Sequence, residues 1–331
     1  MHSFSLAQPQ TITEAIAATA QPDAKTPDAK IIAGGTDLMQ LMKDNVERPD
    51  RLIDIAGLPL GGVEVTAQGL RMGALAHMAE VADHPDVRRD YPAIAQALAA
   101  SASGQVRNMA TIGGNILQRT RCGYFRDTAF ACNKRVRGSG CPAQDGENRF
   151  LAILGTSDHC VATHASDFAV ALAALDAEVE LQGPAGPRRV ALTEFHRVPG
   201  DTPEVETIML PGELITAITV PASRLARNSH YLKVRDRASF EWALISAAVA
   251  LDIGGGRIRA ARVAMGGVGT KPWRLPQVEA ALIGAAADET GFRAAAAHAA
   301  DGARPLNQNG FKLTLMRNTL VRALQATAAT I

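Results

Sequence analysis

Apolar residues near the start of the chain form short runs that are interrupted by glycine. The run at 31–33 predicts a strand that meets Gly34 and Gly35, after which Thr36 and Asp37 can cap a helix over 38–43. A second strand is expected at 51–55. Residues 1–60 therefore read as one unit of strand, glycine turn and helix.

The segment 61–222 mixes strands and helices around an irregular stretch. Its expected elements are a strand at 70–73, helices at 76–82 and 93–100, a loop at 111–115, a strand at 158–163, a helix from the cap Ser166 through Leu175, and a strand at 178–181. Residues 122–149 show neither a helical nor a strand period, and this stretch is too long for an ordinary loop.

The remaining segment, 223–331, has the pattern of an α+β unit. Strands at 243–253 and 257–265 flank a Gly254-Gly255-Gly256 hairpin turn. Helices are expected at 278–285, 292–299 and from 311 to about 324.

Composition narrows the function classes. With 331 residues, 47% of them hydrophobic, the chain can form two or three compact units. The formal charge of +1 gives no global field for nucleic acid, and no stretch approaches the roughly 20 apolar residues of a membrane helix. The N-terminus lacks the pattern of a secretory signal. We expect no nucleic-acid partner, no membrane insertion and no export signal of the chain's own, although a folded chain can be exported with a signal-bearing partner.

Two glycine pairs, Gly34-Gly35 and Gly113-Gly114, are candidates for holding a pyrophosphate. Glycine lets backbone N–H groups approach phosphate oxygens, and a following helix adds its positive N-terminal end. Either pair alone is more often an ordinary tight turn. Neither fits the dinucleotide fingerprint G-x-G-x-x-G or the phosphate-binding P-loop.

All four cysteines, Cys122, Cys132, Cys141 and Cys160, fall within one short window, which suggests a shared role. Two disulfides, a structural zinc site, a [4Fe–4S] cluster or scattered structural thiols would each be compatible. The wide spacing disfavours zinc, and the lack of a secretory signal disfavours disulfides. The surrounding arginines would favour thiolates or serve docking to a partner, and the sequence does not separate these roles.

Residues 33–39 (AGGTDLM) and 110–116 (ATIGGNI) closely resemble the FAD motifs of the xanthine dehydrogenase family, and Ser166-Asp167 and Tyr231-Leu232-Lys233 resemble its later elements. The resemblance implies an α+β fold: a two-lobed FAD-binding domain of the vanillyl-alcohol-oxidase type (lobes 1–60 and 61–222), then a carbon monoxide dehydrogenase flavoprotein C-terminal domain (223–331). It implies an FAD site formed by Ile32, Ala33, Gly34, Gly35, Thr36, Asp37, Leu38, Ser101, Thr111, Gly113, Gly114, Asn115, Asp167, Ile215 and Lys233.

The cysteine-bearing stretch, about 118–160, resembles the cluster loop of FAD subunits of bacterial periplasmic aldehyde oxidoreductases. By that resemblance, Cys122, Cys132, Cys141 and Cys160 would ligate a [4Fe–4S] cluster beside FAD. The alternatives are the flavin subunit of a 4-hydroxybenzoyl-CoA reductase-like complex, which also carries an extra cluster on a loop, and that of a xanthine dehydrogenase-like complex.

The resemblance further implies a heterotrimer. A large subunit with a molybdenum cofactor would oxidise an aldehyde, and a small subunit with [2Fe–2S] clusters would pass electrons to this FAD and on to an external acceptor. No hydrolase or metalloprotease motif suggests catalytic residues in this chain. The lack of a dinucleotide motif argues against NAD as acceptor. A zinc- or disulfide-stabilised scaffold and a free-standing flavin oxidase are the competing hypotheses.

Overall fold

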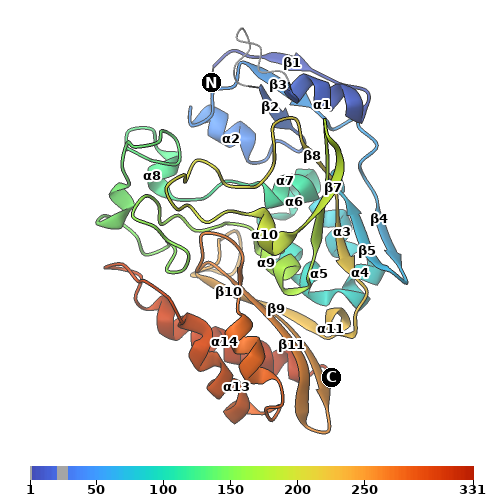
Figure 1. Ribbon diagram of the computed structural model, residues 1–331, viewed down its shortest axis with the longest axis vertical. Helices are drawn as coiled ribbons and strands as arrows, with labels where there is room; N and C mark the ends of the chain where they lie inside the picture. The colour runs from blue at the N-terminus through green and yellow to red at the C-terminus, as the bar shows by residue number, and fades with distance from the viewer. Residues whose placement is uncertain (1, 21–28) are drawn as a thin grey trace.

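The computed structural model describes residues 2–20 and 29–331, which contain three β-sheets. Figure 1 shows these sheets following one another along the long axis, with the N-terminal sheet at one end and the C-terminal sheet at the other. The five-stranded sheet lies between them. None of the helices among the described residues is long and apolar enough to cross a membrane.

The N-terminal unit (the described residues up to Asp54) is a small parallel sheet in the order β1-β3-β2. Its elements are β1 (Ser5–Ala7), α1 (Ile12–Ala20), β2 (Ala29–Ile32), α2 (Leu38–Lys43) and β3 (Arg51–Asp54). Parallel neighbours need a crossover connection, and α2 provides it between β2 and β3. The glycine turn thus lies at the carboxyl end of β2, where open α/β sheets bind their ligands.

The central sheet is antiparallel in the order β4-β5-β8-β6-β7. Its strands are β4 (Val63–Thr66), β5 (Gly69–Gly73), β6 (Glu178–Gly183), β7 (Gly186–Ala191) and β8 (Leu214–Pro221). The helices of this part are α3 (Met78–Asp83), α4 (Pro85–Asp90), α5 (Pro92–Ala99), α6 (Gly104–Met109), α7 (Ile112–Ile116), α8 (Gly123–Arg126), α9 (Asp167–Ala174), α10 (Leu192–Phe195) and α11 (Arg224–Arg227), with a 3-10 turn at Pro142–Gln144.

The C-terminal sheet is antiparallel in the order β12-β11-β10-β9. It consists of β9 (Ser229–Val234), β10 (Ile245–Gly254), β11 (Arg257–Gly266) and β12 (Trp273–Arg274), covered by α12 (Pro276–Leu282), α13 (Glu289–Ala296) and α14 (Lys312–Ala328), with a second 3-10 turn at Ala297–Ala300. The predicted glycine hairpin is confirmed: Gly255 and Gly256 have φ of 61° and 73°, a backbone region that favours glycine.

Helix α9 connects the two larger cores. All eight of its residues are buried, and it packs against α5 on one side and against β10 and β11 on the other. Its predicted N-cap is confirmed, because the Ser166 hydroxyl accepts a hydrogen bond of 2.9 Å from the backbone N–H of Ala169. The cap fixes where α9 begins, and the buried helix therefore holds its first residue, Asp167, in place.

The stretch 122–149 is irregular as expected, apart from α8 and the 3-10 turn. The strand predicted at 158–163 is wrong, since the segment forms only an isolated bridge between Ser157 and Cys160. Its backbone groups pair with neighbouring loops instead: Val161 accepts from Ala152 and His164 donates to Gly269. The short apolar run at 160–162 suggests a strand, but no neighbouring strand is present within the described residues to pair with it.

Candidate functional site

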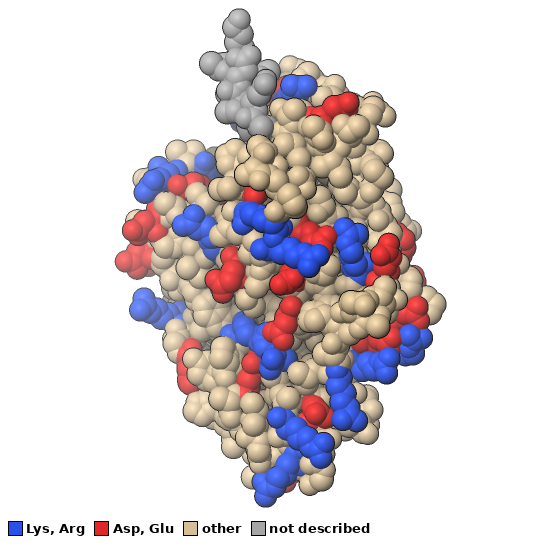
Figure 2. Space-filling view, turned by 45° about the vertical axis from the view of Figure 1, so that its right-hand side comes forward, with Lys and Arg blue, Asp and Glu red and all other residues tan. Residues whose placement is uncertain are grey.

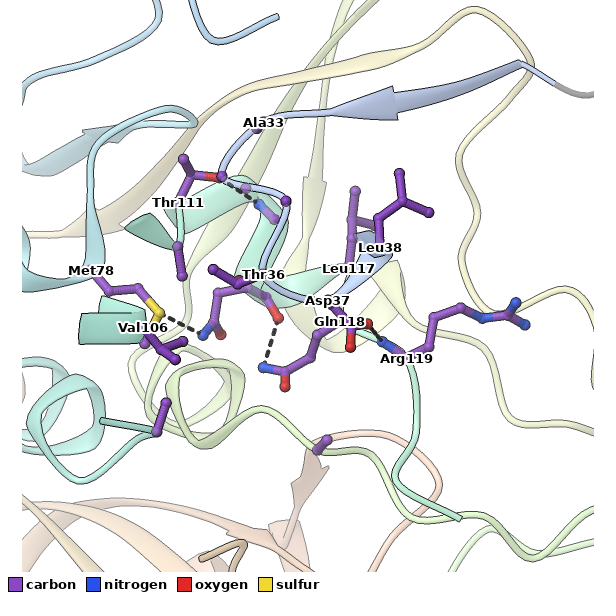
Figure 3. A pocket seen from close by; sticks show the side chains of 18 of the residues that line it. Ala33, Thr36, Asp37, Leu38, Met78, Val106, Thr111, Leu117, Gln118 and Arg119 are labelled. Atoms are coloured by element: carbon purple, nitrogen blue, oxygen red, sulfur yellow. Dashed lines mark hydrogen bonds between the residues drawn. The ribbon is translucent and has the colours of Figure 1, made fainter. Parts of the chain in front are cut away.

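A cavity of about 480 Å³ opens between the N-terminal unit, the central helices and the C-terminal sheet. This volume lies within the range of small-molecule and cofactor sites, roughly 300–1,000 Å³. All fifteen residues that the sequence assigns to an FAD site line it, from Ile32 to Lys233. Figure 3 shows several of them, including Ala33, Thr36 and Thr111, converging from separate elements.

The first glycine loop (residues 33–37) presents hydrogen-bond donors to this cavity. None of the described residues accepts a hydrogen bond from the backbone N–H of Gly34, Gly35, Thr36 or Asp37. Gly35 has φ of 68°, which turns the backbone sharply after β2. A run of unused N–H groups beside a cavity suits the oxygens of a pyrophosphate.

Gly34 is also the point where this loop meets the backbone of Met109 and Ala110, which lead into the second glycine loop (residues 111–115). A Cβ on Gly34 would lie 1.9 Å from the carbonyl oxygen of Met109 and 3.2 Å from Cα of Ala110. Only a glycine allows the two backbones to approach this closely. The two motifs, about 75 residues apart in the sequence, are thus joined by direct backbone contact.

The second glycine loop uses its own N–H groups for internal bonds. Residues 112–116 form the one-turn helix α7 rather than the expected loop, with Thr111 as N-cap accepting from Gly114 at 3.3 Å. Gly113 donates to Ala74 and Ile112 to Ala76. Consequently this loop supplies a firmly held wall of the cavity, whereas the first loop supplies most of the free donors.

Asp167 is the centre of a buried polar group on the other side of the cavity. Its carboxylate accepts hydrogen bonds from Ser101 Oγ at 3.1 Å, from Lys233 Nζ at 2.8 Å and from the hydroxyl of Tyr231. The side chains of Lys233 and Asp167 are only 4% and 7% exposed. Burial and the neighbouring carboxylate raise the pKa of Tyr231 well above its usual value, so its hydroxyl stays a donor.

Asp37 departs from the role expected for it. It occupies the N-cap position of α2, but its side chain makes no capping bond. Instead its carboxylate accepts from the backbone N–H of Arg119 at 2.8 Å, from Arg126 Nη2 at 2.8 Å, and from Arg121. Burial alone would raise the pKa of Asp37, but Arg121 and Arg126 outweigh burial and lower it. Figure 3 shows Asp37 directed towards Arg119.

Several lining residues were missed by sequence reasoning because each stands alone in its segment. They include Met78, Val106, Leu117, Gln118, Met209 and Trp242. No local pattern distinguishes them from ordinary apolar or polar positions; only the closure of distant elements brings them to the cavity. Gln118 and Arg119 lie three and four residues after the second glycine loop, so only an extension of that motif beyond its glycines would have included them.

The four cysteines come together around a small internal space of about 10 Å³. None of them forms a disulfide. Burial raises the pKa of Cys122 to about 11, while the backbone N–H groups of Tyr124 and Phe125 beside its sulfur act in the opposite direction. Burial also raises the pKa of Cys141 and Cys160, and a charge on one cysteine would raise the pKa of others.

Within the described residues, no three or more His, Cys, Asp or Glu side chains are arranged as ligands of a single metal ion. The cysteines instead surround their space with backbone N–H groups facing the sulfurs, from Ala143 and Val161 at Cys141 and from Ala162 at Cys160. The space is thus lined by the four thiols, and none of its lining residues in the described part of the chain carries a carboxylate.

The basic residues around the cysteines are mostly paired within the chain. Arg119 bonds Glu206 Oε2 at 2.7 Å and also contacts Glu47, and Lys134 bonds Glu206 Oε1 at 2.8 Å. Arg135 donates to three backbone carbonyls of the same stretch. Arg137, by contrast, is exposed and lies 3.9 Å from Glu204. Most of these cations therefore hold the stretch to its neighbours.

Figure 2 shows acidic and basic side chains interspersed over the face in view.

A second cavity of about 290 Å³ lies between the first cavity and Cys160. It shares Glu47, Gln118 and Arg119 with the first cavity and includes the buried rings of His164 and His196. Burial lowers the pKa of His196 to about 4. His196 Nε2 lies 2.8 Å from the carbonyl of Ile116, so the neutral ring donates there.

Comparison with known proteins agrees with this geometry. Residues 2–223 match the family described as FAD binding domain in molybdopterin dehydrogenase, and residues 230–327 match the CO dehydrogenase flavoprotein C-terminal domain. The aldehyde oxidoreductase FAD-binding subunit PaoB of Escherichia coli (strain K12) is 48% identical over 98% of this chain and 98% of that protein. The glyceraldehyde dehydrogenase medium chain of Sulfolobus acidocaldarius is 29% identical over 85% of this chain and 81% of its own length.

Among solved structures, carbon monoxide dehydrogenase from Hydrogenophaga pseudoflava is similar with a TM-score of 0.76 at 26% identity, covering 99% of this chain and 98% of that chain. The chain therefore belongs to the molybdopterin dehydrogenase family, as the FAD-binding subunit of an oxidoreductase of the molybdenum hydroxylase type. The predicted family and the order of an FAD-binding domain followed by the flavoprotein C-terminal domain are confirmed.

Proposed function

We propose that the 480 Å³ cavity binds FAD through the fifteen residues named above. The free N–H groups of the first glycine loop would receive the pyrophosphate, because these residues line the cavity and their N–H groups have no acceptor among the described residues. Lys233 and Asp167 would lie beside the polar edge of the flavin ring. FAD supplies the chain with an electron carrier that exchanges one or two electrons, and the residues around it bind, orient and shield it.

We further propose that Cys122, Cys132, Cys141 and Cys160 bind a [4Fe–4S] cluster. The support is the chemistry of the donor set: four unpaired cysteines around one space, with backbone N–H groups facing the sulfurs. Hydrogen bonds to sulfur are among the features that tune such clusters. Each cysteine of a cluster binds a different iron atom, so the thiols need not converge as closely as the ligands of one ion.

In the assembled enzyme, this chain would carry electrons rather than transform the substrate. PaoB is named as a subunit of an aldehyde oxidoreductase, and by analogy we propose aldehydes as substrates. An aldehyde and water give a carboxylic acid, two protons and two electrons. That step would occur on a large molybdenum subunit, with [2Fe–2S] clusters of a small subunit passing both electrons to this FAD and then to an external acceptor.

The proposal also covers the domains of the chain, its assembly with partner subunits and its compartment. The chain would fold as an FAD-binding lobe at 1–60, a second lobe at 61–222 and a C-terminal domain at 223–331. A heterotrimer with the large and small subunits would be its working form. It would be periplasmic when exported with a signal-bearing partner and otherwise cytoplasmic.

The observation that carries the proposal is the convergence of four separated motifs on one cavity. The test is the visible spectrum of the purified chain together with flavin and iron analysis. Flavin bands with a broad shoulder that dithionite bleaches are expected, and replacing Cys132 with Ser should remove the shoulder and iron but leave flavin. Thr128→Ser, an exposed position of the same stretch, is the matched control. A colourless, zinc-containing protein would favour the scaffold hypothesis instead.

A further inference from the structure

Asp37 connects the first glycine loop to the cysteine loop (residues 118–160). It lies two residues after Gly35, yet its side-chain hydrogen bonds within the described residues are to residues of the cysteine loop. These are the backbone N–H of Arg119 and the guanidinium groups of Arg121 and Arg126. The side chains of Asp37 and Arg126 are 17% and 16% exposed, so water competes little for the pair. The direction of the first glycine loop therefore depends on a neighbouring loop that contributes no glycine motif.

A second carboxylate, that of Glu47, lines the cavity and is held in the same way. Glu47, which lies between α2 and β3, contacts Arg119, and Arg119 continues to Glu206. Glu206 in turn bonds Lys134, two residues after Cys132. The cysteine loop therefore holds the carboxylates of both Asp37 and Glu47, and both residues line the FAD cavity.

An apolar contact points to the same link. Leu41, one turn into α2 from Asp37, is buried in a small core that includes Cys122, Phe125 and Cys160. Cys122 is itself the N-cap residue of α8, and Arg126 is the last residue of that single turn. The polar contact at Asp37 and the apolar contact at Leu41 therefore both depend on where Cys122 and α8 lie.

We propose that the cysteine loop positions the first glycine loop, so that filling the four thiols and binding FAD are thermodynamically coupled through Asp37 and Arg126. This inference rests on the proposed function, namely a metal cluster at the cysteines and FAD in the cavity. When the thiols lack metal, no bond joins them, and α8 is released from one of its anchors. Arg126 then loses its fixed position, and the N–H groups after Gly34 lose theirs. Coupling of this kind is reciprocal, so FAD also retains the metal.

The test measures the dissociation constant of FAD by flavin fluorescence, using the full chain with iron bound and after removal of iron by a chelator. We expect binding to weaken about tenfold without iron, within the usual range of coupling between two sites. At equilibrium, removal of iron from the FAD-free chain should need about tenfold less chelator than its removal from the FAD-bound chain. Both readouts are independent of the activity of the assembled enzyme.

Arg126→Met tests the route, because Arg126 bonds Asp37 but does not line the FAD cavity. With iron bound, this variant should bind FAD about as weakly as the iron-free wild type, and iron removal should have little further effect. Arg126→Lys keeps the charge without the forked donors and should be intermediate. Arg137→Met is the control, since it removes the same charge from the same loop at an exposed position.

The outcomes separate this inference from the proposed function. Equal FAD affinity with and without iron overturns the coupling while both cofactor sites stand. A chain that binds flavin but no iron overturns the cluster and the coupling together. Should Arg126→Met fail to fold, the wild-type comparison and Arg126→Lys still decide between coupling and independence. A loss of coupling in Arg137→Met as large as in Arg126→Met would contradict the route through Asp37.

Discussion

Replacing Gly34 with Ala tests the contact between the two glycine loops. The added Cβ would lie 1.9 Å from the carbonyl oxygen of Met109, where ordinary contacts are 3.4–4 Å. Both partners are backbone, so no flexible side chain can yield and one loop must move by more than an ångström. Overpacking of this kind costs about 1–3 kcal/mol. When the FAD-bound chain bears this strain and the free chain relieves it by moving the loop, the dissociation constant of FAD rises roughly 5- to 150-fold.

The measurement pairs FAD titration by fluorescence with urea unfolding of the same protein. Gly57→Ala is the matched control, because a Cβ there meets no atom within 4 Å and the backbone has no positive φ. Gly57→Ala should bind FAD and unfold as the wild type does. Wild-type affinity and stability in Gly34→Ala would refute the reasoning, since it would mean that the two loops need not touch.

Further predictions address the buried polar groups. Lys233→Met should destabilise the chain by about 3–5 kcal/mol in urea unfolding, because it leaves the Asp167 carboxylate buried without its cation; the double variant with Asp167→Asn should recover most of the loss, and an unchanged single variant would contradict the ion pair. The lowered pKa of His196, about 4, means that the unfolded chain binds more protons than the folded chain between about pH 6.5 and 4. Stability should therefore be lost as the pH falls through that window, by about 3 kcal/mol in total from this group. His196→Gln, which keeps a donor for the Ile116 carbonyl, should flatten the pH dependence of the urea midpoint, and an equally steep dependence would contradict it.

The site could be predicted from the sequence where it consists of contiguous motifs. The first glycine loop, the Ser166 cap and the Tyr231-Leu232-Lys233 element are each local patterns, and the fold brings them to one cavity. The helix boundaries of α2 and the hairpin of β10 and β11 followed from periodicity and glycine for the same reason. Each of these features is determined by residues that are close together in the sequence.

Features that depend on contacts between residues far apart in the sequence could not be predicted in this way. Asp37 was expected to cap α2, and only the approach of Arg121 and Arg126, more than 80 residues later, gives its carboxylate stronger partners. The segment 158–163 contains a short apolar run like that of a strand, yet its backbone partners are loops, which no local pattern reveals. Trp242 likewise reaches the cavity only because the C-terminal sheet packs beside α9.

The central claim is that this chain carries electrons from an aldehyde oxidised elsewhere in the complex. An anaerobic titration with aldehyde, followed at the flavin absorption band, tests it most directly. The band should bleach in the assembled complex, where no external acceptor is present, and stay unchanged in the isolated chain. Bleaching in the isolated chain, or a flavin that remains oxidised in a complex that consumes aldehyde, would contradict it.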